Sequence, residues 1–162
     1  MPELVLVDPD FADTAPRVVR VERVIDVSPA QVWNCVLDTS GWTEWFPTMS
    51  RADSMSPRAT HGSSRTVKIG LLVAEEQVVV ADEPLRWGFS VTHTNIPIAK
   101  RLLELLDLED ASTTERARCR VRYTGAFEPL WFNRPLFGLV TRNVARSWRH
   151  GLDGLADHLT AP

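Results

Sequence analysis

The stretch "SPAQVWNCVLDTSGWTEWFP", residues 28–47, decides the fold of this chain. Its first residues form a complete start signal for a helix. The Ser28 hydroxyl can accept a hydrogen bond from a free backbone N–H, Pro29 suits the first helical position, and Gln31 completes a capping box. Apolar residues then recur at helical spacing. The stretch therefore predicts a short helix that starts just after Ser28 and packs on a core.

The turn-rich connector after this helix carries three aromatic rings. Trp42, Trp45 and Phe46 fall in a second short helix predicted over residues 40–46, which ends at Pro47. A small domain normally buries such rings in its core. We expect instead that these rings close one end of an internal cavity, with Trp45 and Phe46 at or near its mouth.

The segments before and after this stretch alternate apolar and polar residues with the two-residue period of strands. In residues 17–27 one face carries Val19, Val21, Ile25 and Val27, and parity places Arg23 on that apolar face as well. Residues 1–16 hold three Asp and three Pro, which predicts an irregular N-terminal arm. The rest of the chain, residues 17–160, is expected to form one domain.

A turn rich in acidic residues and proline joins two further strands into a hairpin. Along residues 85–93 the aromatic side chains share one face with His93. A tight turn sets Val80 opposite Trp87, and the same register places Glu76 on this inner face, near His93. Because a buried charge must be paired or solvated, two interpretations stand. Glu76 neutralises Arg23 or His93 in a core network, or this network orients the polar end of a mostly apolar ligand.

The leucines of residues 103–110 fit a helical stripe as well as a strand. The arginines that alternate with apolar residues in the next segment decide between the two. A hairpin with residues 115–127 sets Asp107 opposite Arg118 and satisfies both faces. We therefore expect residues 103–110 to be a strand, with a stripe of arginines on the solvated outer face: Arg116, Arg118, Arg120 and Arg122.

The last segment has the strongest helical period. Asn133 can cap a helix that runs to about Leu159. Its apolar side chains, Trp148 among them, lie on one face and its charged side chains lie opposite. Gly151 falls on the buried face, where it costs roughly 1 kcal/mol relative to alanine. The close approach of another element, or room for something else, can offset that cost.

The composition excludes several functional classes. The chain has 162 residues, 44% hydrophobic and 24% charged, as expected for a soluble globular protein. Its net charge of −3 argues against a nucleic-acid partner, and no apolar run is long enough to cross a bilayer. Two cysteines form no disulfide framework, and the four histidines show no ligand spacing. We expect a cytoplasmic protein without metal or cofactor.

The order of the elements predicts an α+β fold. One strand is followed by two short helices, a run of antiparallel strands and one long helix. A curved antiparallel sheet wrapped around that helix leaves a cavity between the two. The motifs "VERVIDVSPAQVWNCVLDTSGWTEWFP", "VVVADEPLRWGF" and "ARCRVRYTGAF" resemble the START-like (SRPBCC) superfamily, and more narrowly its polyketide cyclase/dehydrase group.

This resemblance implies a helix-grip fold with a deep hydrophobic ligand cavity, but no single activity. Three hypotheses follow. The chain binds a small hydrophobic molecule, lipid-like or polyketide-like; or it is a polyketide cyclase or dehydratase that uses acid–base residues; or it is a protein-interaction module with a vestigial cavity. We favour the binder. A homodimer is left open by the sequence.

The expected cavity residues are those that parity and helix phase send inward. If a reaction is catalysed, Glu76 and His93 are the candidate acid–base groups. The full set of expected ligand-binding residues is Arg23, Trp45, Phe46, Glu76, Trp87, Phe89, Val91, His93, Tyr123, Phe137, Val140, Val144 and Trp148.

Overall fold

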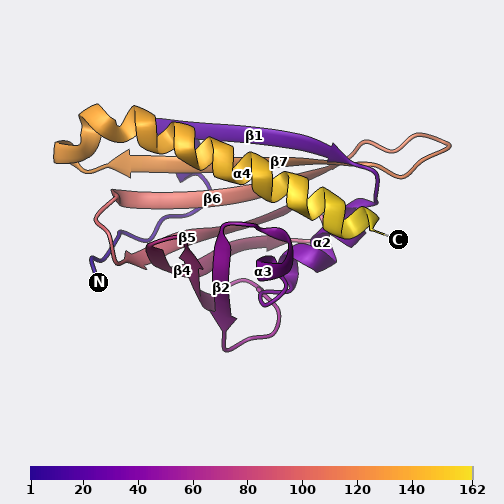
Figure 1. The fold of residues 1–162 in the computed structure, drawn as a ribbon, viewed down its shortest axis with the longest axis horizontal. Helices are drawn as coiled ribbons and strands as arrows, with labels where there is room; N and C mark the ends of the chain where they lie inside the picture. The colour runs from indigo at the N-terminus through magenta and orange to yellow at the C-terminus, as the bar shows by residue number, and fades with distance from the viewer. Residues whose placement is uncertain (162) are drawn as a thin grey trace.

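The computed structural model describes residues 1–161, apart from the side chain of Arg134. It has a seven-stranded antiparallel sheet in the order β1-β7-β6-β5-β4-β3-β2, crossed on one face by one long helix (Figure 1). This is the expected α+β helix-grip fold. The strands are β1 (Arg17–Ile25), β2 (Met49–Ser54), β3 (Ser64–Ile69), β4 (Leu72–Asp82), β5 (Arg86–Thr94), β6 (Ala99–Asp110) and β7 (Cys119–Pro129).

The predicted helix start at Ser28 is confirmed, whereas the predicted start at Asn133 is wrong. The Ser28 side chain accepts a hydrogen bond from the Gln31 backbone, and the Gln31 side chain completes the capping box. Asn133, in contrast, does not cap the long helix. It lies in a 3₁₀ helix, and its side chain donates to the carbonyl of Ile98 at 2.8 Å. The helices are α1 (Phe11–Thr14), α2 (Pro29–Leu37), α3 (Trp42–Trp45), η1 (Trp131–Leu136) and α4 (Phe137–Thr160).

The leucine-rich segment is a strand, as predicted, but the predicted register is wrong. Asp107 pairs with Arg122, four residues further along β7 than the expected Arg118. The reason is that β7 starts only at Cys119, so the connection is longer than the sequence suggests. Because the error is an even number of residues, each side chain keeps its face. The arginines form surface ion pairs with Glu22, Asp26 and Glu109, as a solvated face requires.

Two irregularities in the β4–β5 ladder change which residues face inward. Val79 is an extra residue in β4, so Val80 pairs with Gly88 instead of Trp87. Thr92 is an extra residue in β5, so His93 pairs with Glu75 while Val91 pairs with Glu76. A bulge reverses the alternation of faces beyond it. The sequence therefore predicts the wrong face for Val80 and for His93.

The N-terminal arm lies against the outer face of the sheet. The Leu4 and Val5 N–H groups donate to the carbonyls of Thr92 and Lys100 at 2.7 and 2.9 Å, and residues 11–14 form one helical turn, α1. Phe11 is buried with a small apolar cluster on this face: Val80, Leu103, Leu105 and Ala126. The arm thus covers apolar side chains that α4, on the other face, cannot reach.

The C-terminal half of α4 packs closely on the aromatic turn of α3. A Cβ atom on Gly151 would lie 2.6 Å from the Phe46 ring, and one on Gly154 would collide with the carbonyl oxygen of Trp45. The close approach predicted for Gly151 is therefore confirmed. None of the helices among residues 1–161 combines the length and hydropathy that a membrane-spanning helix needs.

Candidate ligand-binding site

A largely apolar cavity of about 240 Å³ lies between the N-terminal half of α4 and the inner face of the sheet. The sheet and its loops contribute Ile69, Leu72, Ile98, Leu102, Glu104 and Phe127. The helix contributes Phe137, Val140, Asn143, Val144, Ser147 and Trp148. Among these lining residues Glu104 alone carries an ionisable side chain.

Glu104 reaches the cavity because successive side chains of β6 point to opposite faces of the sheet. Leu102 and Leu106 on the same face are buried in the main core, so Glu104 between them points inward as well. The Tyr123 hydroxyl, from the neighbouring strand β7, donates a hydrogen bond to the Glu104 carboxylate. Burial, followed by the negative charge of Glu76, raises the pKa of Glu104 to about 8. At neutral pH the carboxyl is mostly protonated, and it can both donate and accept a hydrogen bond.

An ion pair lies buried behind this carboxyl group. Arg65 on β3 donates from Nε to Glu76 Oε2 at 2.6 Å, and the two side chains are 2% and 5% exposed. The Arg65 guanidinium lies 4.2 Å from the centroid of the Trp42 ring and 4.9 Å from that of Trp87. Burial raises the pKa of Glu76, while the charge and hydrogen bond of Arg65 lower it. No residue among 1–161 accepts a hydrogen bond from the two terminal nitrogens of Arg65.

An aromatic stack forms one wall of the site. The rings of Tyr123 and Trp148 stack with centroids 4.3 Å apart and planes within 13°. Gly125, which pairs with Glu104 across the β6–β7 ladder, leaves the space that the Trp148 ring fills, because a Cβ atom there would collide with that ring. The stack therefore packs beside the strand that carries the carboxyl group, and the Tyr123 hydroxyl holds that group in place.

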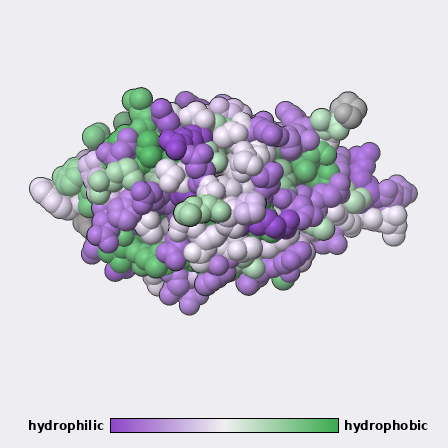
Figure 2. All heavy atoms as spheres, turned by 90° about the horizontal axis from the view of Figure 1, so that it is seen from below, coloured by the Kyte–Doolittle hydropathy of each residue, from purple (hydrophilic) through white to green (hydrophobic). Residues whose placement is uncertain are grey.

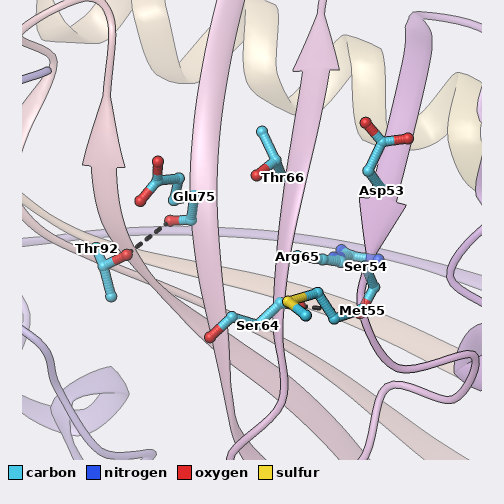
Figure 3. A pocket seen from close by; sticks show the side chains of 8 residues that line it. All are labelled: Asp53, Ser54, Met55, Ser64, Arg65, Thr66, Glu75 and Thr92. Carbon is cyan, nitrogen blue, oxygen red and sulfur yellow. Dashed lines mark hydrogen bonds between the residues drawn. The ribbon is translucent and has the colours of Figure 1, made fainter.

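A larger hollow of about 400 Å³ lies on the opposite face of the sheet, with α4 on the far side (Figure 3). Its side chains include Asp53, Thr66, Glu75 and Thr92, which stand apart along β2 to β5 and do not converge on one point. This hollow is therefore a weaker candidate for a site. Among residues 1–161, no group of three or more His, Cys, Asp or Glu side chains is placed to hold a metal ion.

The structure brings part of the expected set together. Phe137, Val140, Val144 and Trp148 all line the cavity from α4. Tyr123 is buried and points inward, with its hydroxyl on Glu104. Glu76 is buried, as parity predicted, but its partner is Arg65 rather than Arg23 or His93.

Two expected polar residues lie outside the site. Arg23 forms an ion pair with Asp153 of α4 and is 40% exposed, because β1 is the edge strand of the sheet. His93 lies 3.1 Å from Glu75 with 38% of its side chain exposed, because the bulge at Thr92 turns it away from the core.

The expected aromatic and valine residues outside α4 belong to the core instead of the cavity wall. Trp45 and Phe46 are 2% and 1% exposed and pack against α4 at its C-terminal half, so they do not form a mouth. The strand residues Trp87, Phe89 and Val91 are also buried in the main core, near Arg65 in the case of the two rings. None of these five lines the cavity described above.

Sequence reasoning missed Glu104 and Arg65. The signal for Glu104 was available, because placing Leu106 inward on a strand also places Glu104 inward. The signal for Arg65 was weaker. It shares a face of β3 with buried Val67, but its partner depends on the β3–β4 register, which sets Arg65 opposite Glu76.

Comparison with solved structures shows the fold. A START superfamily protein from Mycobacterium smegmatis has a TM-score of 0.72 at 12% identity, over 88% of this chain and 99% of that one. The protein XoxI from Bacillus cereus has a TM-score of 0.71 at 16% identity, over 89% and 96%. A protein from Thermobifida fusca has a TM-score of 0.68 at 22% identity, over 88% and 92%.

A search among curated proteins found no match. A family model described as polyketide cyclase / dehydrase and lipid transport, however, matches residues 16–160. That range includes all seven strands, α4 and every residue that lines the cavity. The chain therefore belongs to the polyketide cyclase / dehydrase and lipid transport family.

Proposed function

We propose that this protein binds a small, mostly apolar molecule with one neutral hydrogen-bonding group, in the cavity between α4 and the sheet. The observation that carries the proposal is the position of Glu104, the single ionisable side chain on an otherwise largely apolar wall. Ligand sites commonly combine an apolar lining with a few polar groups that fix orientation. The family to which the chain belongs supports this class of ligand.

The size and charge of the site restrict the chemical class of the ligand further. About 240 Å³ is below the roughly 300–1,000 Å³ typical of sites for drug-sized ligands, which favours a compact molecule. A ligand carboxylate would meet a site that disfavours negative charge, because burial raises the pKa of the carboxyl group already there. A hydroxyl or ketone oxygen, in contrast, can exchange a hydrogen bond with protonated Glu104. We therefore favour a neutral alcohol, phenol or ketone.

Binding can be tested with an apolar anilinonaphthalene dye and by native mass spectrometry of freshly purified protein. Val140→Trp should fill the cavity and abolish both dye binding and any co-purified ligand. His150→Trp is the matched control, because His150 is exposed on the same helix. Equal dye binding by wild type, Val140→Trp and His150→Trp would place the dye elsewhere and contradict the proposal.

A second candidate function is the cyclase or dehydratase chemistry that the family description includes. The observation that favours it is a carboxyl group with a pKa of about 8 inside the cavity, since a general acid or base works best with a pKa near the working pH. Glu104, rather than Glu76 or His93, would move the proton. Glu104→Gln should then lower turnover of a poly-β-ketone by about 100- to 10,000-fold while the variant still binds it. Unchanged turnover would exclude this role.

A further inference from the structure

Four large apolar side chains protrude within nine consecutive residues at the start of the C-terminal helical segment. We name them the apolar rim, and their exposed fractions are 80% for Trp131, 53% for Phe132, 63% for Leu136 and 60% for Leu139. Figure 1 places the start of α4 at one end of the molecule, and the face drawn in Figure 2 shows hydrophobic side chains at that end among others. Exposed apolar groups in such a cluster mark a site of interaction with a protein or a membrane.

The apolar rim lies next to the cavity. Phe137 and Val140, which alternate with the rim residues along the chain, both line the cavity. The Asn133 side chain donates to the carbonyl of Ile98, another lining residue, so η1 is tied to the loop between β5 and β6. In that loop Ile96 is also exposed, by 41%. A partner that covers the rim therefore covers the same end of the molecule as the cavity.

The charged side chains in the part of the helical segment that carries the rim have one sign. Residues 129–152 include four arginines and no acidic residue, in a chain whose net charge is −3. Arg142 and Arg146 are exposed and fall three and seven residues after Leu139, which places all three on one helix face. Within the described part of the chain no carboxylate forms an ion pair with Arg142, Arg146 or Arg149. The outer face of α4 near the rim is thus cationic and unneutralised.

We propose that the apolar rim and the arginines of α4 dock this protein on the surface of an anionic phospholipid bilayer. Trp and Phe side chains favour the membrane interface, and a helix with apolar and basic side chains on its free surface lies in the interface plane. A second copy of the chain fits less well. In a two-fold contact the same patch faces itself, and residues 129–152 offer no acidic side chain to pair with its four arginines. Anionic headgroups supply the opposite charge.

Vesicle binding is measured without added ligand, so that it tests the apolar rim separately from the proposed function of the cavity. Co-sedimentation with vesicles of phosphatidylcholine alone, and of phosphatidylcholine with added phosphatidylglycerol, separates the apolar and the ionic contributions. Wild type should bind the anionic vesicles and release them at high salt. Trp131→Ser with Phe132→Ser should weaken binding by at least about tenfold, and Arg142→Glu with Arg146→Glu by at least about 25-fold.

Two matched controls make the test specific. Leu85→Ser removes an apolar side chain that is 62% exposed but lies before β5, at the opposite end of that nine-residue strand from Ile96. Arg20→Glu with Arg58→Glu makes the same charge change at exposed positions outside α4. Both controls should bind vesicles like wild type.

Three results would overturn the proposal. The first is no binding to anionic vesicles, or equal binding to neutral and anionic ones. The second is an equal loss in the control variants, which would make the effect nonspecific. The third is a stable dimer in light scattering that the Trp131→Ser and Phe132→Ser pair dissociates, because the rim would then be an interface between copies of the chain.

Discussion

Replacing Glu104 by glutamine should reduce the pH dependence of this protein's stability between about pH 4.5 and pH 8. The pKa of Glu104 rises from its ordinary 4.5 to about 8 in the folded protein, chiefly because the group is buried. Below pH 4.5 the carboxyl is protonated in both states, and the fold is not penalised. Above that pH the unfolded chain loses the proton first, so the free energy of unfolding falls until the folded form ionises near pH 8.

The magnitude follows from the same two values. At about 1.4 kcal/mol for each pKa unit, the rise to about 8 corresponds to roughly 5 kcal/mol of unfolding free energy lost across this range. Three other groups act on the Glu104 carboxyl: Glu76 of β4 raises its pKa, while Arg65 of β3 and Tyr123 of β7 lower it. The helix α4 brings no titratable side chain to the cavity. Because the pKa of Glu76 is also raised, the glutamine variant should keep a smaller slope of the same sign.

Urea unfolding followed by tryptophan fluorescence at about pH 5, 7 and 9 measures this slope. Glu109→Gln is the matched control, because Glu109 lies on the same strand with 59% of its side chain exposed. It should leave the pH dependence of wild type unchanged. If Glu104→Gln and wild type lose stability in parallel as the pH rises, the carboxyl of Glu104 is ionised in the fold, and the reasoning on its burial is wrong.

Three further substitutions test the packing by thermal or urea unfolding. Trp148→Ala should cost about 3–5 kcal/mol, because the ring is 4% exposed and stacks on a neighbouring ring; a loss below that range would mean that the ring mainly faces the cavity. Gly154→Ala should cost about 1–3 kcal/mol of stability, because the new Cβ atom would collide with the Trp45 backbone. Gly138→Ala, on the same helix, should gain about 0.5–1 kcal/mol, because its Cβ atom would meet nothing within 4 Å. Equal effects of the two substitutions would refute the contact between Gly154 and Trp45. Arg65→Met should cost about 3–5 kcal/mol, and adding Glu76→Leu should recover most of it; no recovery would show that the cation itself stabilises the aromatic residues around it.

Most of the fold could be predicted because the signals are local. The capping residues of α2, the alternation of β1 and the apolar stripe of α4 each depend on a few neighbouring residues. The errors in register and in the facing of strand residues come from features that depend on more than one segment of the chain. The register of β6 on β7 depends on where β7 begins at Cys119, and the bulges at Val79 and Thr92 depend on the twist of the whole sheet.

The site was harder to predict than the fold for the same reason. Residues on α4 were placed well, because helix phase determines which of them face the sheet. Residues on the strands required a register, and two bulges reversed the alternation for part of them. His93 left the predicted site in this way. Glu104 was overlooked because its leucine neighbours made the segment look purely apolar, although their parity indicates its direction.

The tight contact of α3 and the cavity lie at opposite halves of α4. Gly151 and Gly154 let the C-terminal half of α4 press on Phe46 and on the backbone of Trp45. The residues that line the cavity, from Phe137 to Trp148, all come from the N-terminal half of the same helix. The cavity thus lies under the half of the helix that α3 does not contact. Trp45 and Phe46, which the sequence suggested at the mouth, therefore hold the C-terminal half of α4. The open space, with Glu104 on its wall, lies under the other half of the helix.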